Sequence, residues 1–368
     1  MKNKRLIYIV VGILLVGIAA LFYINYFLIP KNGGGGIVAT ATKPIGKIKP
    51  LFSIYGPGKG NAAKFRRPMS VATDKDENIY VTDTGNQRVV VFNRKGEFMF
   101  EFGGLGFAKP VPGVKATWKP GLFEYPYGID IDKETGNIFV ADMTNQRIQI
   151  FDSKGKFLDW FPKERYGGTA GDIYPTDIAV EGGKVYICNP YQVVIFDTKG
   201  KFIKDFGMPG SGEDGKFDRP NGIDVGKDGT IYVSDSNNLR VQAFTPEGKF
   251  KWAYGKKTGF NDNKGRVMGL PRNLAVGPDG NIYVVDAFHF NIKVFDPQGK
   301  KVAAMGKRGL ADGYFNYPNG IEVTDKGRVY VVDKENNRVQ ALSLTGFEID
   351  EEEDANSGQN MPGQMMKL

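Results

Sequence analysis

The sequence predicts an all-β fold, a six-bladed β-propeller, preceded by an N-terminal transmembrane helix. The propeller is predicted by a motif that recurs six times, with Asn78–Phe92 (NIYVTDTGNQRVVVF) as its clearest copy. The Asp of this motif, or its Asn substitute at 189, recurs every 46 to 59 residues, a spacing typical of blades with four strands. The helix is predicted by 24 uncharged residues, Leu6–Ile29, which are enough to span a bilayer.

The N-terminal region predicts a membrane anchor. Three basic residues, at positions 2, 4 and 5, precede the apolar stretch, so the positive-inside rule places the N-terminus in the cytoplasm and the propeller outside. The alternative is a cleaved secretory signal with Ala39-Thr40-Ala41 as its site, but the apolar stretch is longer than a usual signal core. We expect residues 1–30 to form a cytoplasmic stub and anchor, and residues 31–43, with four consecutive glycines, to form a flexible linker.

Residues 44–347 contain the repeats. Each copy opens with a proline and holds four short apolar segments joined by turns that contain glycine, as in tight hairpins. The middle segments are apolar at successive positions, which is expected for strands covered on both faces.

The two ends of the repeat array predict ring closure. Lys49–Gly56 has the pattern of a fourth strand but precedes the first copy, whereas the sixth copy ends near Phe347 without a good fourth strand. We expect Leu51–Tyr55 to pair into the sixth blade and close a monomeric ring without exposed strand edges. Residues 348–368 begin with an acidic run and are predicted to be a disordered tail.

The repeated pattern resembles the NHL-repeat family, which folds as a six-bladed propeller. The resemblance covers roughly residues 45 to 347 and implies the fold rather than one activity. Four copies carry the complete loop motif Asp-x-x-Asn-x-Arg: Asp83, Asn86 and Arg88; Asp142, Asn145 and Arg147; Asp235, Asn238 and Arg240; Asp333, Asn336 and Arg338. Its repetition favours a structural role, with Asp accepting from turn amides and Arg connecting loops. A polar ring that binds a ligand is the alternative.

The composition excludes several classes of site. The single cysteine, Cys188, excludes an intramolecular disulfide, a cysteine metal cluster and a RING-type ubiquitin ligase. The single histidine excludes the multi-histidine zinc site of the peptidyl-amidoglycolate lyases, which are similar propellers. No P-loop or nucleophile elbow occurs in the sequence. The net charge of +8 permits an anionic partner, but an exported domain is not expected to bind nucleic acid.

A binding surface is expected where the repeats differ. The fifth copy replaces the motif Asn by His289, which Phe288 and Phe290 flank, and the long junction between the first two copies carries Trp118. Aromatic residues on loops are common binding anchors. These four residues are our predicted contact site for a protein or another component of the cell envelope, with no catalytic residue and no cofactor.

An enzyme is the alternative prediction. Lactonase-like six-bladed propellers hold a divalent cation in the central channel, and the starts of the inner strands here offer four oxygen ligands: Asp177, Asn221, Asn273 and Asn319. The alternative function is therefore a calcium-dependent hydrolase. The two asparagines at 221 and 319 directly follow their prolines, whereas the other two residues lie one position further, so the four side chains need not converge.

Overall fold

The computed structural model describes residues 49–58, 60, 63–107, 119–163, 172–255 and 268–344. The chain divides into two compact units, 1–42 and 43–368, and every described residue belongs to the second unit. The predicted anchor at residues 6–29, the linker at 31–43 and the tail at 348–368 lie outside the described residues. Within the described ranges, no helix is long and apolar enough to cross a membrane.

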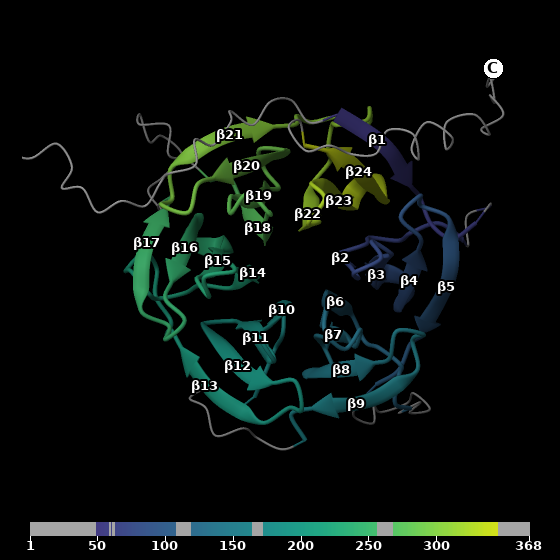
Figure 1. Ribbon diagram of the computed structural model, residues 1–368, viewed down its shortest axis with the longest axis horizontal. Coiled ribbons are helices and arrows are strands. Elements are labelled where there is room, and N and C mark those ends of the chain that lie inside the picture. The colour runs from purple at the N-terminus through teal and green to yellow at the C-terminus, as the bar shows by residue number, and fades with distance from the viewer. Residues whose placement is uncertain are drawn as a thin grey trace, which may run out of the picture. The chain divides into compact units, whose positions relative to one another are not determined.

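Six antiparallel sheets of four strands surround a central axis, as Figure 1 shows. The first three are β2 (Val71–Thr73), β3 (Ile79–Asp83), β4 (Arg88–Phe92) and β5 (Phe98–Gly103); β6 (Pro126–Ile131), β7 (Ile138–Asp142), β8 (Arg147–Phe151) and β9 (Phe157–Phe161); and β10 (Asp177–Glu181), β11 (Lys184–Asn189), β12 (Gln192–Asp197) and β13 (Phe202–Phe206). The next two are β14 (Pro220–Val225), β15 (Ile231–Asp235), β16 (Arg240–Phe244) and β17 (Phe250–Tyr254); and β18 (Pro271–Val276), β19 (Ile282–Asp286), β20 (Asn291–Phe295) and β21 (Lys301–Met305). The all-β six-bladed prediction is confirmed.

The sixth blade joins the two ends of the propeller. It contains β22 (Pro318–Val323), β23 (Arg328–Asp333) and β24 (Arg338–Ser343), and its fourth strand is β1 (Lys49–Ile54). In the antiparallel β1–β24 pair, Ile54 lies opposite Val339. The prediction that the segment before the first copy completes the sixth blade is therefore confirmed, with the strand one or two residues earlier than expected.

The hydrophobic core is divided among the contacts between neighbouring blades. In one such cluster, Ala72 and Val89 of the first blade lie with Ile129 and Val140 of the second. Every residue of β3 is buried, whereas the outermost strand β5 alternates between exposed and partly buried residues. This burial on both faces explains the continuous apolar runs in the sequence. Cys188 is a free, fully buried side chain within one of these clusters.

The chain direction gives the ring two different faces. We call the one with the proline junctions and the Asp-x-x-Asn-x-Arg loops the junction face. The opposite one carries the glycine turns that join the first strand to the second and the third to the fourth, and we call it the turn face. The six inner strands, β2, β6, β10, β14, β18 and β22, line the channel between these faces (Figure 1).

Candidate functional site

The inner segments alternate between two types around the channel. If the opening proline is position one, position three is occupied in blade order by Ser70, Gly128, Asp177, Gly222, Asn273 and Gly320. Position five is occupied by Ala72, Asp130, Ala179, Asp224, Ala275 and Glu322. Blades two, four and six therefore combine glycine with an acidic residue, and blades one, three and five combine a polar residue with alanine.

Close approach of neighbouring blades explains the glycines. A Cβ atom on Gly222 would lie 2.6 Å from Cα of Asn273 and 2.5 Å from the carbonyl oxygen of Arg272. A Cβ on Gly128 would lie 2.7 Å from Cα of Asp177. These contacts are with backbone atoms that cannot rotate away, so glycine is required where the next blade presses against the strand.

The junction-face mouth of the channel is closed by a hydrogen-bond network across four blades. The hydroxyl of Tyr127, a buried residue, donates to Oδ1 of Asn221 at 2.7 Å, and Nη2 of Arg272 donates to the same hydroxyl. Nε of Arg272 donates to Oδ1 of Asn319 at 2.9 Å. Burial raises the pKa of Tyr127, and the nearby Arg272 opposes that rise. The network places a guanidinium group, with only neutral hydrogen-bond partners among the described residues, at the mouth.

The four residues proposed as calcium ligands form two separate groups. Asn221 and Asn319 belong to the network around Tyr127 and Arg272, whereas Oδ2 of Asp177 accepts from Nδ2 of Asn273 at 2.9 Å. Burial raises the pKa of Asp177 well above its usual range, which weakens this carboxyl group as a ligand for a cation. Asn319 already accepts from the guanidinium of Arg272, and Asn221 accepts from the Tyr127 hydroxyl that this guanidinium contacts, so this set does not fit a divalent cation. Between 49 and 344, the described residues contain no group of three or more His, Cys, Asp or Glu arranged to hold a metal ion.

The interior of the channel is narrow. A cavity of about 30 Å³ lies among the inner strands and is lined by residues that include Asp130, Asp177 and Asn273. That volume has room for about one or two water molecules and for no organic substrate.

The repeated Asp-x-x-Asn-x-Arg loops form internal contacts. In blade four, Oδ2 of Asp235 accepts from Arg240 Nε and from Asn238 Nδ2, each at 2.8 Å. Oδ1 of Asp235 accepts from the backbone amide of Asp218, which precedes the inner strand. The equivalent contacts recur in the other complete copies, at Asp83, Asp142 and Asp333. Each motif thus connects the loop to the junction that enters its own blade.

The fifth blade makes a different cluster from the same position. Oδ2 of Asp286 lies 2.8 Å from Nδ1 of His289 and 2.5 Å from Nζ of Lys293, and this lysine is the residue that sequence reasoning missed. Burial acts to raise the pKa of Asp286, but His289 and Lys293 outweigh it, and the pKa is lowered. Burial lowers the pKa of Lys293 although Asp286 opposes this. The comparison with the other copies could have revealed Lys293, since it replaces the glutamine found at 149, 242 and 340.

Phe288 and Phe290, two of the predicted aromatic contact residues, lie on the junction face with different exposure. Phe288 is 56% exposed and meets Tyr317 edge to face, with ring centroids 5.8 Å apart. Phe290 is partly buried under the guanidinium of Arg308, which lies 5.3 Å from its ring centroid. Trp118 lies outside the described residues. Phe288, His289 and Phe290 are consecutive residues of one loop, and their role as a contact site stays a prediction.

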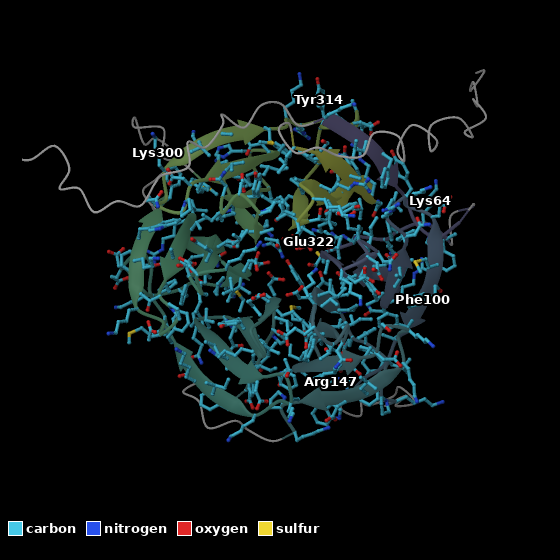
Figure 2. The ribbon with its side chains drawn as sticks, viewed as in Figure 1. Lys64, Phe100, Arg147, Lys300, Tyr314 and Glu322 are labelled. Atoms are coloured by element: carbon cyan, nitrogen blue, oxygen red, sulfur yellow. The ribbon has the colours of Figure 1, made fainter. Side chains whose placement is uncertain are left out.

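The turn-face mouth of the channel holds a cavity that sequence reasoning missed. Its volume is about 330 Å³, and its lining includes Asp130, Asp224 and Glu322 from alternate inner strands. Figure 2 shows Glu322 near the middle of the ring. An alignment of the six proline-opened segments would have shown these acidic residues at one position, but their convergence depends on the ring.

Comparison with known proteins supports the resemblance found in the sequence. A family model described as the SMP-30/gluconolactonase/LRE-like region matches residues 128–354, and an NHL-repeat model matches residues 65–92. NHL repeat-containing protein 2 of Bos taurus is 24% identical over 346 residues, covering 75% of this chain and 46% of that protein. Protein brain tumor of Drosophila melanogaster is 27% identical over 177 residues, covering 46% of this chain and 15% of that protein.

The curated relatives are longer proteins. Peptidyl-glycine alpha-amidating monooxygenase B of Xenopus laevis is 27% identical over 247 residues, which cover 61% of this chain and 26% of the relative. The chain thus spans less than half the length of each of these three relatives.

Solved structures share the fold. A gluconolactonase from Xanthomonas campestris has a TM-score of 0.54 at 13% identity, covering 82% of this chain and 99% of that one. A streptogramin B lyase has a TM-score of 0.52 at 15% identity, covering 76% of this chain and 94% of that one. At these identities the likeness concerns the propeller and not its chemistry.

Proposed function

The chain belongs to the SMP-30/gluconolactonase/LRE-like family, and from this premise we propose that its NHL-type propeller is a binding module outside the cytoplasmic membrane. In this proposal residues 6–29 anchor the chain with its N-terminus in the cytoplasm. The junction face binds a protein of the cell envelope that presents an acidic segment.

The observation that carries this proposal is the junction-face mouth itself. Arg272 lies there with neutral hydrogen-bond partners, and Lys334, whose Nζ lies 3.1 Å from Oε1 of Glu335, is close to it. Burial lowers the pKa of Lys334, Glu335 opposes this, and the charges of Arg272 and Arg67 add to the lowering. Lys334 lies 4.6 Å from the ring centroid of Tyr317, against which the exposed Phe288 packs. A cationic centre beside exposed aromatic rings suits an acidic protein segment with an apolar neighbour.

A calcium-dependent lactonase-like hydrolase is the second candidate, favoured by the family model over residues 128–354. Its proposed ligands are Asp177, Asn221, Asn273 and Asn319, whose oxygens have the internal partners described above. The binding module is favoured because an arginine occupies the place where a cation would need anionic ligands.

One set of variants, made in the full-length chain and purified in detergent, distinguishes the binding module from the hydrolase. Pull-downs from cell-envelope extract, at low and at high salt, compare two double variants used as bait. The first carries Trp118→Ala and Phe288→Ala, and the second carries Lys95→Ala and Lys199→Ala on the turn face. We expect the first pair to lose a salt-sensitive partner that the second pair retains. Loss only with the lysine pair would place the partner on the other face. Calcium-dependent lactone hydrolysis that Asn221→Ala abolishes would favour the enzyme instead.

A further inference from the structure

The turn-face cavity is negative in a protein that is basic overall. Its lining, drawn from all six blades, contains seven acidic side chains and four lysines, whereas the full sequence has a net charge of +8. A concave site that concentrates one sign of charge attracts ligands of the other sign. The cavity volume of about 330 Å³ is large enough for a small organic molecule.

The floor of the cavity carries three carboxylates in fixed positions. Backbone amides of the following blades donate to two of them, Val180 N to Asp130 Oδ2 at 2.6 Å and Val276 N to Asp224 Oδ2 at 2.7 Å. The third, Glu322, accepts from the hydroxyl of Thr73 at 2.7 Å through Oε1. The other oxygen of each aspartate also accepts a backbone amide, from Ile131 to Asp130 and from Val225 to Asp224, each at 2.7 Å. A carboxylate offers about four lone pairs, so these contacts orient the groups and leave lone pairs for further donors.

A lysine of this chain already places an ammonium group there. Nζ of Lys133 donates to the carbonyl oxygen of Thr73 and lies 3.7 Å from Oε1 of Glu322. Burial acts to lower the pKa of Lys133, but Glu322 and Asp130 outweigh it, and the pKa is raised. The Lys133 side chain is 46% exposed, so the carboxylates stabilise a protonated amine at the rim of the cavity.

Glu77 contributes a further carboxylate group to the same lining. Glu77 is 5% exposed, and no donor among the described residues reaches its Oε1 atom, whereas Oε2 lies 3.6 Å from Nζ of Lys326. Buried polar atoms are normally paired, so an unpaired oxygen beside a cavity is consistent with a donor supplied by a ligand.

The three carboxylates come from alternate blades, so they suit a cation that can reach more than one of them. No three acidic groups among the described residues are arranged around one metal ion. We infer that the turn-face cavity binds an oligoamine, a small linear molecule with two or more protonated amines, whose ammonium groups bind Asp130, Asp224 and Glu322. This site is independent of the proposed junction-face function.

Such binding depends on pH with a definite sign. Burial raises the pKa of Asp130 to about 7, and Lys133 opposes the rise while Glu322 adds to it. Burial raises the pKa of Asp224 to about 8, with the amide of Val276 opposing and Asp130 and Glu322 adding. The charged form of each group binds an ammonium, so affinity increases as pH rises through these values while amines remain protonated.

Isothermal titration calorimetry of the full-length chain in a non-ionic detergent, with spermidine as the probe, tests the inference. We expect affinity to increase about tenfold or more from pH 6 to pH 8.5, with proton release. Asp224→Asn should weaken binding about tenfold at pH 8.5 and flatten the pH dependence, whereas Glu247→Gln, at an exposed turn, should change neither.

Lys133→Gln is a second variant, which tests the same inference if Asp224→Asn does not fold stably. Lys133→Gln removes the internal ammonium, so it should strengthen spermidine binding several-fold, which a merely structural role would not produce. The Trp118→Ala and Phe288→Ala pair should leave this binding unchanged, which separates it from the junction face. Absence of binding at pH 8.5, binding indifferent to Asp224→Asn and Lys133→Gln, or binding of calcium in place of spermidine would overturn the inference.

Discussion

Ring closure by β1 predicts a large effect from a single side chain near the start of the propeller. Ile54 is 5% exposed and packs in a cluster with Phe65 and Val339, although 285 positions separate it from the latter. Replacement of a buried isoleucine by alanine costs about 2–5 kcal/mol, depending on how far the site collapses. Because β1 is an outer strand and has room to relax, we expect about 2–4 kcal/mol for Ile54→Ala.

The assay is thermal unfolding of the full-length chain, followed by circular dichroism. For a domain of this size, each kcal/mol lowers the melting temperature by about 2 °C, so Ile54→Ala should lower it by about 4–8 °C. Ser53→Ala is the matched control in the same strand, because among the described residues the Ser53 hydroxyl bonds to Asp312 alone, in an exposed contact. That control should remain within about 0.5 kcal/mol of the parent. Equal melting temperatures for Ile54→Ala and Ser53→Ala would refute closure by this strand.

Three further predictions concern the blades, the fifth loop and the anchor. Gly222→Ala should lower the free energy of unfolding in denaturant by about 3 kcal/mol or more, because the added Cβ would meet the backbone of the next blade. Gly58→Ala is the control and should be near neutral, and equal denaturation midpoints for the two variants would contradict this prediction. Folding lowers the pKa of Asp286, so the charged carboxylate stabilises the folded state fully at neutral pH, and this contribution is lost as pH falls below about 4. Asp286→Asn should therefore lower the free energy of unfolding more at pH 7 than at pH 3, whereas Asp214→Asn, at an exposed position, should have little effect at either pH. A C-terminal tag should be removed by external protease from intact spheroplasts, and protection until lysis would contradict the proposed orientation.

The number of blades and the way the ring closes could be predicted because both depend on local, repeated signals. The Ile-Tyr-Val segments, the glycine turns and the opening prolines recur in order, and each specifies a strand or a turn within its own copy. The unpaired segment at Lys49–Ile54 and the incomplete sixth copy then allowed one simple pairing.

The mouths of the channel could not be predicted in the same way. Tyr127 meets Asn221 and Arg272 across 94 and 145 positions of sequence. Each occupies the position directly after a proline, where five different residue types occur among the six copies. Lys293 could not be assigned from the loop motif, because it lies on the following strand four residues after the changed histidine, which it contacts only in the folded blade. Contacts of this kind form between side chains of different blades across the channel, and a pattern within one copy does not contain that information.

The alternation of residue types in the inner segments also explains why the two mouths of the channel differ in charge. Glycine at position three of blades two, four and six lets the next blade approach closely, so the middle of the channel narrows to a cavity of about 30 Å³. Side chains on either side of this constriction contact different sets of residues: Arg272 bonds to Tyr127 and Asn319, while Glu322 lies by Thr73 and Lys133. A positive centre at one mouth and a negative cavity at the other are therefore compatible, because the packed inner strands separate them. Substitutions at one mouth can change its ligand without altering the other.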